Sequence, residues 1–171
     1  MIPARYAATR FPAKLMQILG EKTVIRHTYD ATVATGLFDE VLVVTDSEII
    51  YTEITATGGN AVMSQYEHES GSDRIAEAAS GMEVDIIVNV QGDTPFVKRE
   101  PLQQLLSQFD DPGVQVASMM QVLTSQEEIL DPNFVKVAVD RNNNALFFSR
   151  SVIPYPRDTA YPTTYFEHIG V

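Results

Sequence analysis

Residues 85–93, Asp85-Ile86-Ile87-Val88-Asn89-Val90-Gln91-Gly92-Asp93, decide how this sequence is interpreted. The β-branched run at 85–90 is typical of a strand buried in the middle of a sheet. Two polar residues that follow it, Gln91 and Asp93, would then lie at the carboxyl end of that strand. Runs of the same kind predict further strands at 41–45, 114–121 and 134–139.

Segments with helical spacing lie between these runs, and we predict helices over 24–36, 47–57, 72–80 and 100–109. The first of them follows Thr23, and Gly36 at its end suits the position just past a helix terminus. Strand–helix–strand alternation of this kind predicts an α/β sandwich with a largely parallel sheet.

The composition is that of an ordinary globular domain, with 171 residues, 44% of them hydrophobic and 20% charged. No apolar run approaches the roughly 20 residues needed to cross a bilayer. The absence of cysteine excludes disulfides and thiolate metal sites, and it fits a cytoplasmic location. A net charge of -11 argues against general nucleic-acid binding, but a locally basic pocket could still hold a small anion.

Both ends of the chain are expected to be incomplete. Only Ile2 precedes Pro3-Ala4-Arg5, where a full first strand is expected, and the chain stops at His168-Ile169-Gly170-Val171, which resembles the start of a strand. We therefore expect residues 1–171 to form a single domain that is incomplete at its N- and C-termini.

The first candidate loop, residues 3–14, carries Arg5, Arg10 and Lys14 among small residues. Arginine matches phosphate oxygens with two parallel hydrogen bonds, and lysine adds a mobile point charge. A solvated loop with incidental positive charge explains the segment equally well. It is neither a Walker A loop nor a dinucleotide-binding turn, because neither glycine pattern is present.

The second candidate loop begins at Gln91. Asp93, next to Gly92, is well sited to hold Mg²⁺, which prefers oxygen ligands. Taken alone, an aspartate before Thr94-Pro95 is more often an ordinary turn residue. Gln91 carries both a donor and an acceptor, and this pair suits the edge of a nucleotide base.

Two further segments carry arginines. Arg74 lies in the first turn of the helix predicted at 72–80, where the helix dipole disfavours a cation, so another interaction is expected to hold it there. Arg150 and Arg157 flank a proline-stiffened stretch that should be extended. That arrangement suits a carboxylate-bearing ligand, and a surface loop with solvated arginines is an equal alternative.

Taken together, the segments resemble the CMP-Kdo synthetase (3-deoxy-manno-octulosonate cytidylyltransferase) family over almost the whole chain. Asn-Val-Gln-Gly-Asp at 89–93 and Phe-Ser-Arg-Ser at 148–151 followed by Ile-Pro at 153–154 are the most specific, since they separate this family from the related CMP-sialate synthetases. The other matching stretches are 2–7, 9–12, 43–46, 70–77, 144–147 and 168–170.

The resemblance implies a Rossmann-like three-layer α/β/α nucleotidyltransferase fold of the nucleotide-diphospho-sugar transferase type, with a mostly parallel central sheet. It also implies a reaction, in which CTP and the acidic sugar Kdo give CMP-Kdo and pyrophosphate for lipopolysaccharide biosynthesis in Gram-negative bacteria. The partners would be CTP, Kdo and, in the complete protein, a second copy of the chain; no nucleic acid or membrane insertion is expected.

Site residues also follow from the resemblance. Arg5, Lys14 and Asp93 are the implied catalytic residues, with Asp93 as a ligand of the Mg²⁺ cofactor. The implied nucleotide ligands are Arg5, Arg10 as the weaker candidate, Lys14, Arg74 and Gln91. The implied sugar ligands are Arg150, Arg157 and His168.

One departure from the family lies in the first loop. The family usually reads Phe-Pro-Gly-Lys-Pro-Leu there, whereas this chain reads Phe11-Pro12-Ala13-Lys14-Leu15-Met16. Ala13 restricts the backbone if a positive φ is needed at that position. Two alternatives remain open: a related cytidylyltransferase that acts on a sialic acid, and a nucleotide-binding fragment that lacks part of its metal site and is inactive.

Overall fold

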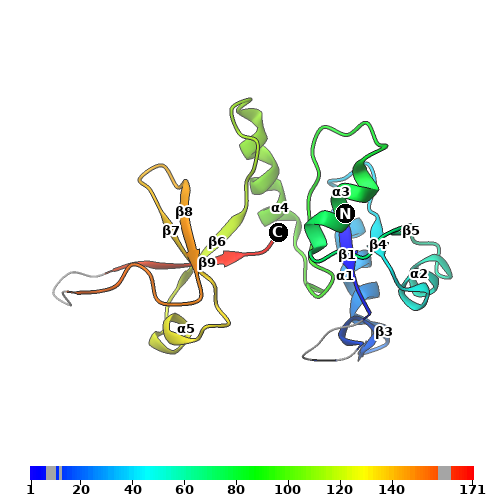
Figure 1. The fold of residues 1–171 in the computed structure, drawn as a ribbon, viewed down its shortest axis with the longest axis horizontal. Coiled ribbons are helices and arrows are strands. Elements are labelled where there is room, and N and C mark those ends of the chain that lie inside the picture. Colours follow the sequence, from blue (N-terminus) through cyan, green and yellow to red (C-terminus); the bar gives the residue numbers. More distant parts are fainter. Residues whose placement is uncertain (7–10, 12, 158–162) are drawn as a thin grey trace. The chain divides into compact units, whose positions relative to one another are not determined.

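The computed structural model describes residues 1–6, 11, 13–157 and 163–171. Two compact units are present, one formed by Met1–Ser107 together with Val171 and the other by Gln108–Gly170 (Figure 1). Each unit is described below by itself. The expectation that residues 1–171 make up one domain stays a prediction.

A three-stranded parallel sheet forms the centre of the first unit. Its strands are β1 (Ile2–Ala4), β4 (Val43–Thr45) and β5 (Ala61–Met63), and their order is β1-β4-β5. All residues of β1 and β4 are buried, as the continuous apolar run at 41–45 predicts for a central strand. The strand predicted at 41–45 is thus confirmed, although only its last three residues form the ladder.

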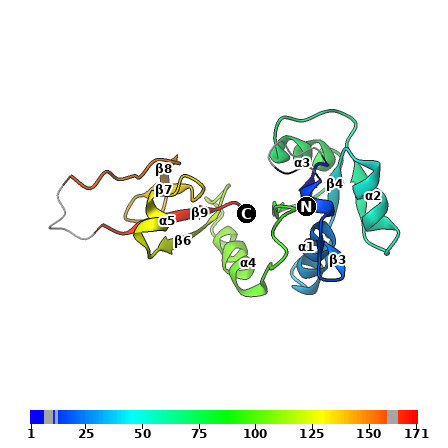
Figure 2. The same ribbon diagram turned by 90° about the horizontal axis from the view of Figure 1, so that it is seen from below.

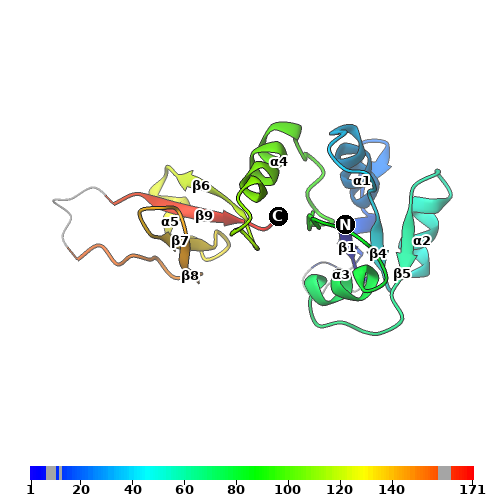
Figure 3. The same ribbon diagram turned by 90° about the horizontal axis from the view of Figure 1, so that it is seen from above.

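All four predicted helices are present: α1 (Val24–Ala34), α2 (Glu48–Thr55), α3 (Gly71–Ala79) and α4 (Arg99–Leu106). The Thr23 side chain caps α1 by accepting from the Arg26 N–H, and Gly36 just past its end has φ 60°, as predicted. Figures 2 and 3 show α1 and α3 on opposite sides of β1 and β4. The predicted layered α/β fold is therefore confirmed.

The stretch at 85–90 lies beside β1 but forms no regular strand, so this part of the prediction is wrong. Val90 N–H donates to the Met1 carbonyl at 3.0 Å, and the Met1 amino group donates to the Val88 carbonyl at 2.7 Å. Burial of this amino group lowers its pKa to about 6, which Glu40 partly opposes. In a parallel ladder Pro3 would face this stretch next, and proline has no N–H to continue it.

A connecting segment with short elements of its own joins β1 to α1. It contains the 3₁₀ turn η1 (Lys14–Met16) and a two-stranded hairpin of β2 (Ile18–Leu19) and β3 (Lys22–Thr23). Thr23, the last residue of β3, is also the N-cap of α1, so the connecting segment leads directly into that helix.

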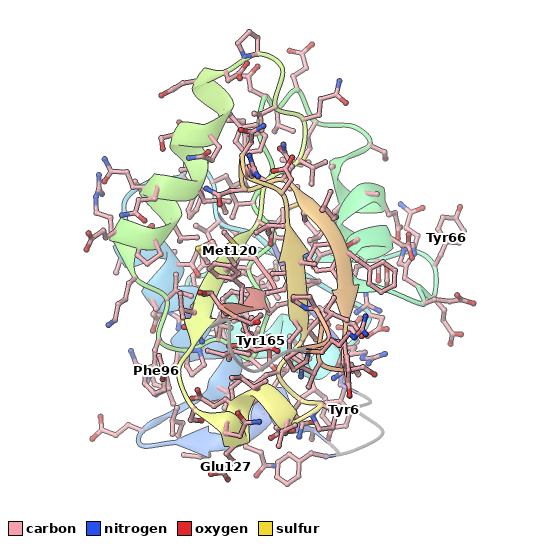
Figure 4. The ribbon with its side chains drawn as sticks, turned by 90° about the vertical axis from the view of Figure 1, so that its left-hand side faces the viewer. Tyr6, Tyr66, Phe96, Met120, Glu127 and Tyr165 are labelled. Atoms are coloured by element: carbon pink, nitrogen blue, oxygen red, sulfur yellow. The ribbon has the colours of Figure 1, made fainter. Side chains whose placement is uncertain are left out.

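An antiparallel sheet makes up most of the second unit. Its strands are β6 (Met119–Leu123), β7 (Lys136–Val139), β8 (Ala145–Ser149) and β9 (Tyr165–Ile169), in the order β6-β9-β7-β8. Met120 and Tyr165, labelled in Figure 4, belong to the neighbouring strands β6 and β9. The 3₁₀ turn η2 (Ser107–Asp110) precedes this sheet, and α5 (Gln126–Leu130) follows β6 with a complete capping box.

The predicted strand at 134–139 is confirmed as β7, whereas the one at 114–121 is displaced to β6. Residues 114–118 form no strand because β9, the neighbour of β6, ends in register with Met119 at Ile169. None of the helices in the described part of the chain is long and apolar enough to span a membrane.

Candidate functional site

The two loops that the sequence singles out begin at the same edge of the first unit's sheet. β4 and β5 lie on one side of β1, and Val88–Val90 lies on the other, so the chain order of the strands reverses at β1. Ligands of open α/β sheets bind at such a reversal, outside the carboxyl ends of the strands. The loops that leave Ala4 and Val90 flank this position.

A cavity of about 240 Å³ occupies this position, and three of the predicted nucleotide ligands line it: Arg5, Arg74 and Gln91. The remaining wall residues are Pro3, Ala4, His68, Glu69, Ser70 and Gly71. A shallower hollow elsewhere on this unit includes Glu48 and Glu53 of α2 in its wall, and therefore does not suit an anion.

Arg74 is the more buried of the two arginines that line the cavity, with 4% of its surface exposed. One guanidinium N–H donates to the Ala4 carbonyl at 2.9 Å, and another pairs with the Asp46 carboxylate at 2.5 Å. These contacts hold the arginine in the first turn of α3, where the helix dipole disfavours a cation and the sequence therefore predicts a compensating interaction. Its Nε is buried and has no hydrogen-bond partner among the described residues, although Arg74 as a whole lines the cavity.

Lys14 and Asp93 connect the two loops. Lys14 Nζ donates to Asp93 Oδ2 at 2.5 Å, and both side chains remain about half exposed. Lys14 follows Ala13, whose backbone has φ 55° and ψ 30°. The position therefore does require the left-handed conformation, which costs a residue with a Cβ roughly 1–2 kcal/mol.

Gly92 sets the spacing between the second loop and the rest of the unit. A Cβ at this position would lie 3.1 Å from the Pro3 carbonyl and 3.3 Å from the side chains of Ile25 and Leu15. The Gly92 carbonyl also accepts a hydrogen bond from Thr28 Oγ1 at 2.9 Å. Glycine thus allows the loop to approach β1 and α1 closely, and this close packing fixes the backbone position of the next residue, Asp93.

Gly92→Ala is expected to lower the free energy of unfolding by about 1–3 kcal/mol, because the added methyl group overpacks a site bounded by backbone. Urea denaturation would measure the change. Gly81→Ala is the matched control, since a Cβ at Gly81 meets nothing within 4 Å, and it should change stability little. Equal effects of the two substitutions would contradict the packing role of Gly92.

The residues present are compatible with Mg²⁺ only in the company of a phosphate ligand. No group of three acidic, histidine or cysteine residues in the described ranges could hold a metal ion by itself. Asp93 offers one partly exposed carboxylate, and Mg²⁺ is often held by one carboxylate together with substrate phosphates and waters. Magnesium binding by Asp93 stays a prediction.

The predicted sugar ligands Arg150, Arg157 and His168 all belong to the second unit. The Arg150 guanidinium donates to the Pro132 carbonyl at 2.8 Å. Arg157 is exposed, and its side chain has no partner within the residues that the structure describes.

His168 lies in β9 at the edge of a small cluster. Its Nε2 is 2.7 Å from Ser118 Oγ, and its ring meets Phe148 edge-on with a centroid distance of 4.8 Å. Burial lowers the pKa of His168, and the nearby Glu167 opposes this, so the imidazole is mainly neutral at pH 7.

Sequence reasoning did not identify two of the contacts around the cavity. Asp46 holds Arg74 through an ion pair, and Glu77 holds the wall residue His68 through a hydrogen bond. The first contact joins residues 28 positions apart and the second joins residues 9 positions apart across the start of α3, and no sequence motif signals either of them. One predicted ligand, Arg10, lies outside the described residues.

Comparisons with known proteins identify the family of this chain. A family model described as cytidylyltransferase matches residues 1–171. The 3-deoxy-manno-octulosonate cytidylyltransferase of Flavobacterium johnsoniae is 60% identical, with 100% of this chain and 71% of that protein aligned. The protein of the same name from Christiangramia forsetii is 52% identical over 100% of this chain and 70% of its own.

A solved structure of CMP:2-keto-3-deoxy-manno-octonic acid synthetase complexed with CTP is also similar. It superimposes with a TM-score of 0.91 at 39% identity, and the match covers 99% of this chain and 70% of that one. Family model, relatives and solved structure agree over essentially the whole length of the chain. The chain therefore belongs to the 3-deoxy-manno-octulosonate cytidylyltransferase family.

Proposed function

We propose that this protein transfers CMP from CTP to Kdo and releases pyrophosphate, a reaction that supplies CMP-Kdo for lipopolysaccharide biosynthesis. The observation that carries the proposal is the cavity beside β1, which Arg5, Arg74 and Gln91 line together. The chain is also 60% identical to the 3-deoxy-manno-octulosonate cytidylyltransferase of Flavobacterium johnsoniae. A basic cavity in a chain of net charge -11 favours a small anion over a nucleic acid.

The chemistry requires that a sugar hydroxyl oxygen bonds to the α-phosphorus and gives up its proton to solvent, while the bond from that phosphorus to the bridging oxygen of pyrophosphate breaks. Arg5 is exposed and has no side-chain partner in residues 1–6, 11, 13–157 and 163–171, so it is available to a phosphate. Lys14 adds a mobile charge, and the buried Nε of Arg74 has no partner in the part of the chain that the structure describes.

Mg²⁺, held by Asp93 and the triphosphate, would neutralise charge that develops on the phosphates. Asp93 already lies beside a cation, because Lys14 Nζ donates to its Oδ2, and Oδ1 is the oxygen that would be left for the metal. The pair thus offers the nucleotide one positive and one metal-seeking group within 2.5 Å of each other.

The acid substrate is assigned to Arg150, Arg157 and His168, whose neutral imidazole can exchange a hydrogen bond with a sugar hydroxyl. A cytoplasmic location and a homodimeric complete protein belong to the same proposal. A sialic acid in place of Kdo is the competing acceptor.

Pyrophosphate release tests the proposal. We expect release with CTP, Kdo and Mg²⁺ together, and little with a sialic acid as acceptor. CTP binding without release would identify a nucleotide-binding protein that does not complete the reaction. Release with the sialic acid but not with Kdo would assign the other acceptor.

Arg157→Ala is expected to raise the KM for Kdo roughly tenfold or more and to leave the KM for CTP nearly unchanged, because a charge-assisted hydrogen bond to the acid is lost. Steady-state kinetics with each substrate varied in turn would measure both constants. Arg141→Ala, which removes an exposed arginine from the turn between β7 and β8, is the matched control. An Arg157→Ala defect that fell equally on both substrates would contradict the assignment.

A further inference from the structure

The segment 64–70 connects β5 to α3 without any helix or strand, yet it forms one wall of the cavity beside β1. His68, Glu69 and Ser70 are the wall residues. Tyr66, by contrast, points away into solvent and is 67% exposed (Figure 4). A wall built from irregular backbone needs side-chain contacts to hold its shape, since no ladder of backbone bonds does so.

Glu77 of α3 supplies those contacts. Its Oε1 accepts from the Gln65 N–H at 2.7 Å, and its Oε2 accepts from His68 Nε2. His68 and Glu77 are themselves mostly buried, with 14% of the His68 side chain and 18% of the Glu77 side chain exposed. The hydrogen bond from His68 is the main reason why the pKa of Glu77 is lowered, so the carboxylate stays ionised at neutral pH.

The helix that carries Glu77 is itself attached to β1. Arg74, one turn earlier on α3, donates to the Ala4 carbonyl, and Gly71 approaches Pro3 so closely that a Cβ would lie 3.0 Å from its ring. Glu77 therefore holds residues 65–68 to a helix whose position relative to the cavity is already set. The ends of the segment are fixed separately: the Ser64 N–H donates to the Thr45 carbonyl, and Ser70 caps α3.

We propose that the His68–Glu77 pair is a positioning device for the nucleotide, which holds the 64–70 wall in the shape that CTP needs. Glu77 does not line the cavity and acts through His68. The inference rests on the proposed function, because it takes CTP as the occupant of the cavity. It predicts an effect on the nucleotide and none on the acid substrate, whose assigned ligands lie in the second unit.

CTP affinity, measured by calorimetry, tests the inference with two alanine variants. His68→Ala and Glu77→Ala are each expected to weaken CTP binding roughly tenfold, as loss of a charge-assisted hydrogen bond does. The double variant should be no worse than Glu77→Ala alone, because that substitution already removes the contact with His68. The KM for Kdo should change less than about twofold. Glu67→Ala is the matched control, since Glu67 is an exposed acid of the same segment outside the cavity wall.

A conservative pair of variants separates positioning from general loss of structure. Glutamine can place its amide where Nε2 of His68 lies, whereas asparagine is too short to reach Glu77. His68→Gln should therefore retain nearly wild-type CTP affinity, and His68→Asn should lose about tenfold. This comparison also decides the matter if the alanine variants do not fold.

The outcomes distinguish this inference from the proposed function. If the wild-type protein binds CTP and the alanine variants bind it equally well, the inference is wrong and the proposed function stands. Equal affinities of His68→Gln and His68→Asn, or losses that fall equally on CTP and Kdo, would also overturn it. Failure of the wild-type protein to bind CTP would overturn both.

Discussion

Turnover of CTP and Kdo should fall on the order of a hundredfold or more in Asp93→Asn, because the substitution removes the charged oxygen assigned to the metal. The amide keeps the size of the side chain and one acceptor oxygen, so the loop that Gly92 positions should keep its shape. Pyrophosphate release at saturating CTP and Kdo, with Mg²⁺ varied, measures the effect. The loss should be in kcat, since the metal would neutralise charge that develops on the phosphates during the reaction.

Stability should hardly change in the same variant. Asp93 is paired with Lys14, but both side chains are about half exposed, and exposed ion pairs contribute little to the free energy of unfolding. A large fall in melting temperature would therefore show that Asp93 has a structural role which the described contacts do not reveal.

Lys14→Met separates the two ways in which Asp93 could act. If Asp93 serves only to hold Lys14, the double variant should be no slower than Lys14→Met alone, because Lys14→Met already removes both the lysine charge and the pair. If Asp93 binds the metal, the double variant should be clearly slower than Lys14→Met alone. Near wild-type turnover of Asp93→Asn at limiting Mg²⁺ would exclude the metal role altogether.

Local patterns were sufficient for the helices and for the identity of the two loops. Thr23 and Gly36 mark the ends of α1, and the glycines at 58–59 follow α2, because caps and left-handed positions depend on only a few neighbouring residues. The fold class followed from the same alternation of segments. The sequence did not predict that Ala13 has a positive φ. It predicted only that such a φ would be costly, since the residue type sets the cost of that conformation but does not show whether it is adopted.

Contacts between residues distant in the sequence could not be predicted from local sequence patterns. The ladder at 85–90 stops because Pro3, more than eighty positions away, has no N–H to offer. The order β6-β9-β7-β8 depends on strands that meet across long connections, and apolar alternation gives no partner for a strand. The need for a partner of Arg74 was predictable from the helix dipole, but Asp46 as that partner was not.

Arg74→Met is expected to reduce the free energy of unfolding by about 2–4 kcal/mol and to weaken CTP binding as well. The guanidinium is buried between the Ala4 carbonyl and the Asp46 carboxylate, so its loss leaves a buried acceptor without a donor. The upper end for a broken buried pair does not apply, because about a third of the Asp46 side chain is exposed and water can replace part of the lost contact. Urea denaturation and calorimetry with CTP measure the two effects.

Arg74→Lys separates the structural effect from the effect on binding. A lysine at this position can still donate to the Ala4 carbonyl or pair with Asp46, so most of the stability should be retained. It cannot supply the Nε–H that has no partner among the described residues, and an ammonium does not reproduce the planar set of donors. CTP affinity should therefore fall roughly tenfold while stability falls far less. If the lysine variant binds CTP as tightly as the wild type, the free Nε–H is not a nucleotide ligand, and Arg74 serves only to join α3 to β1 and Asp46.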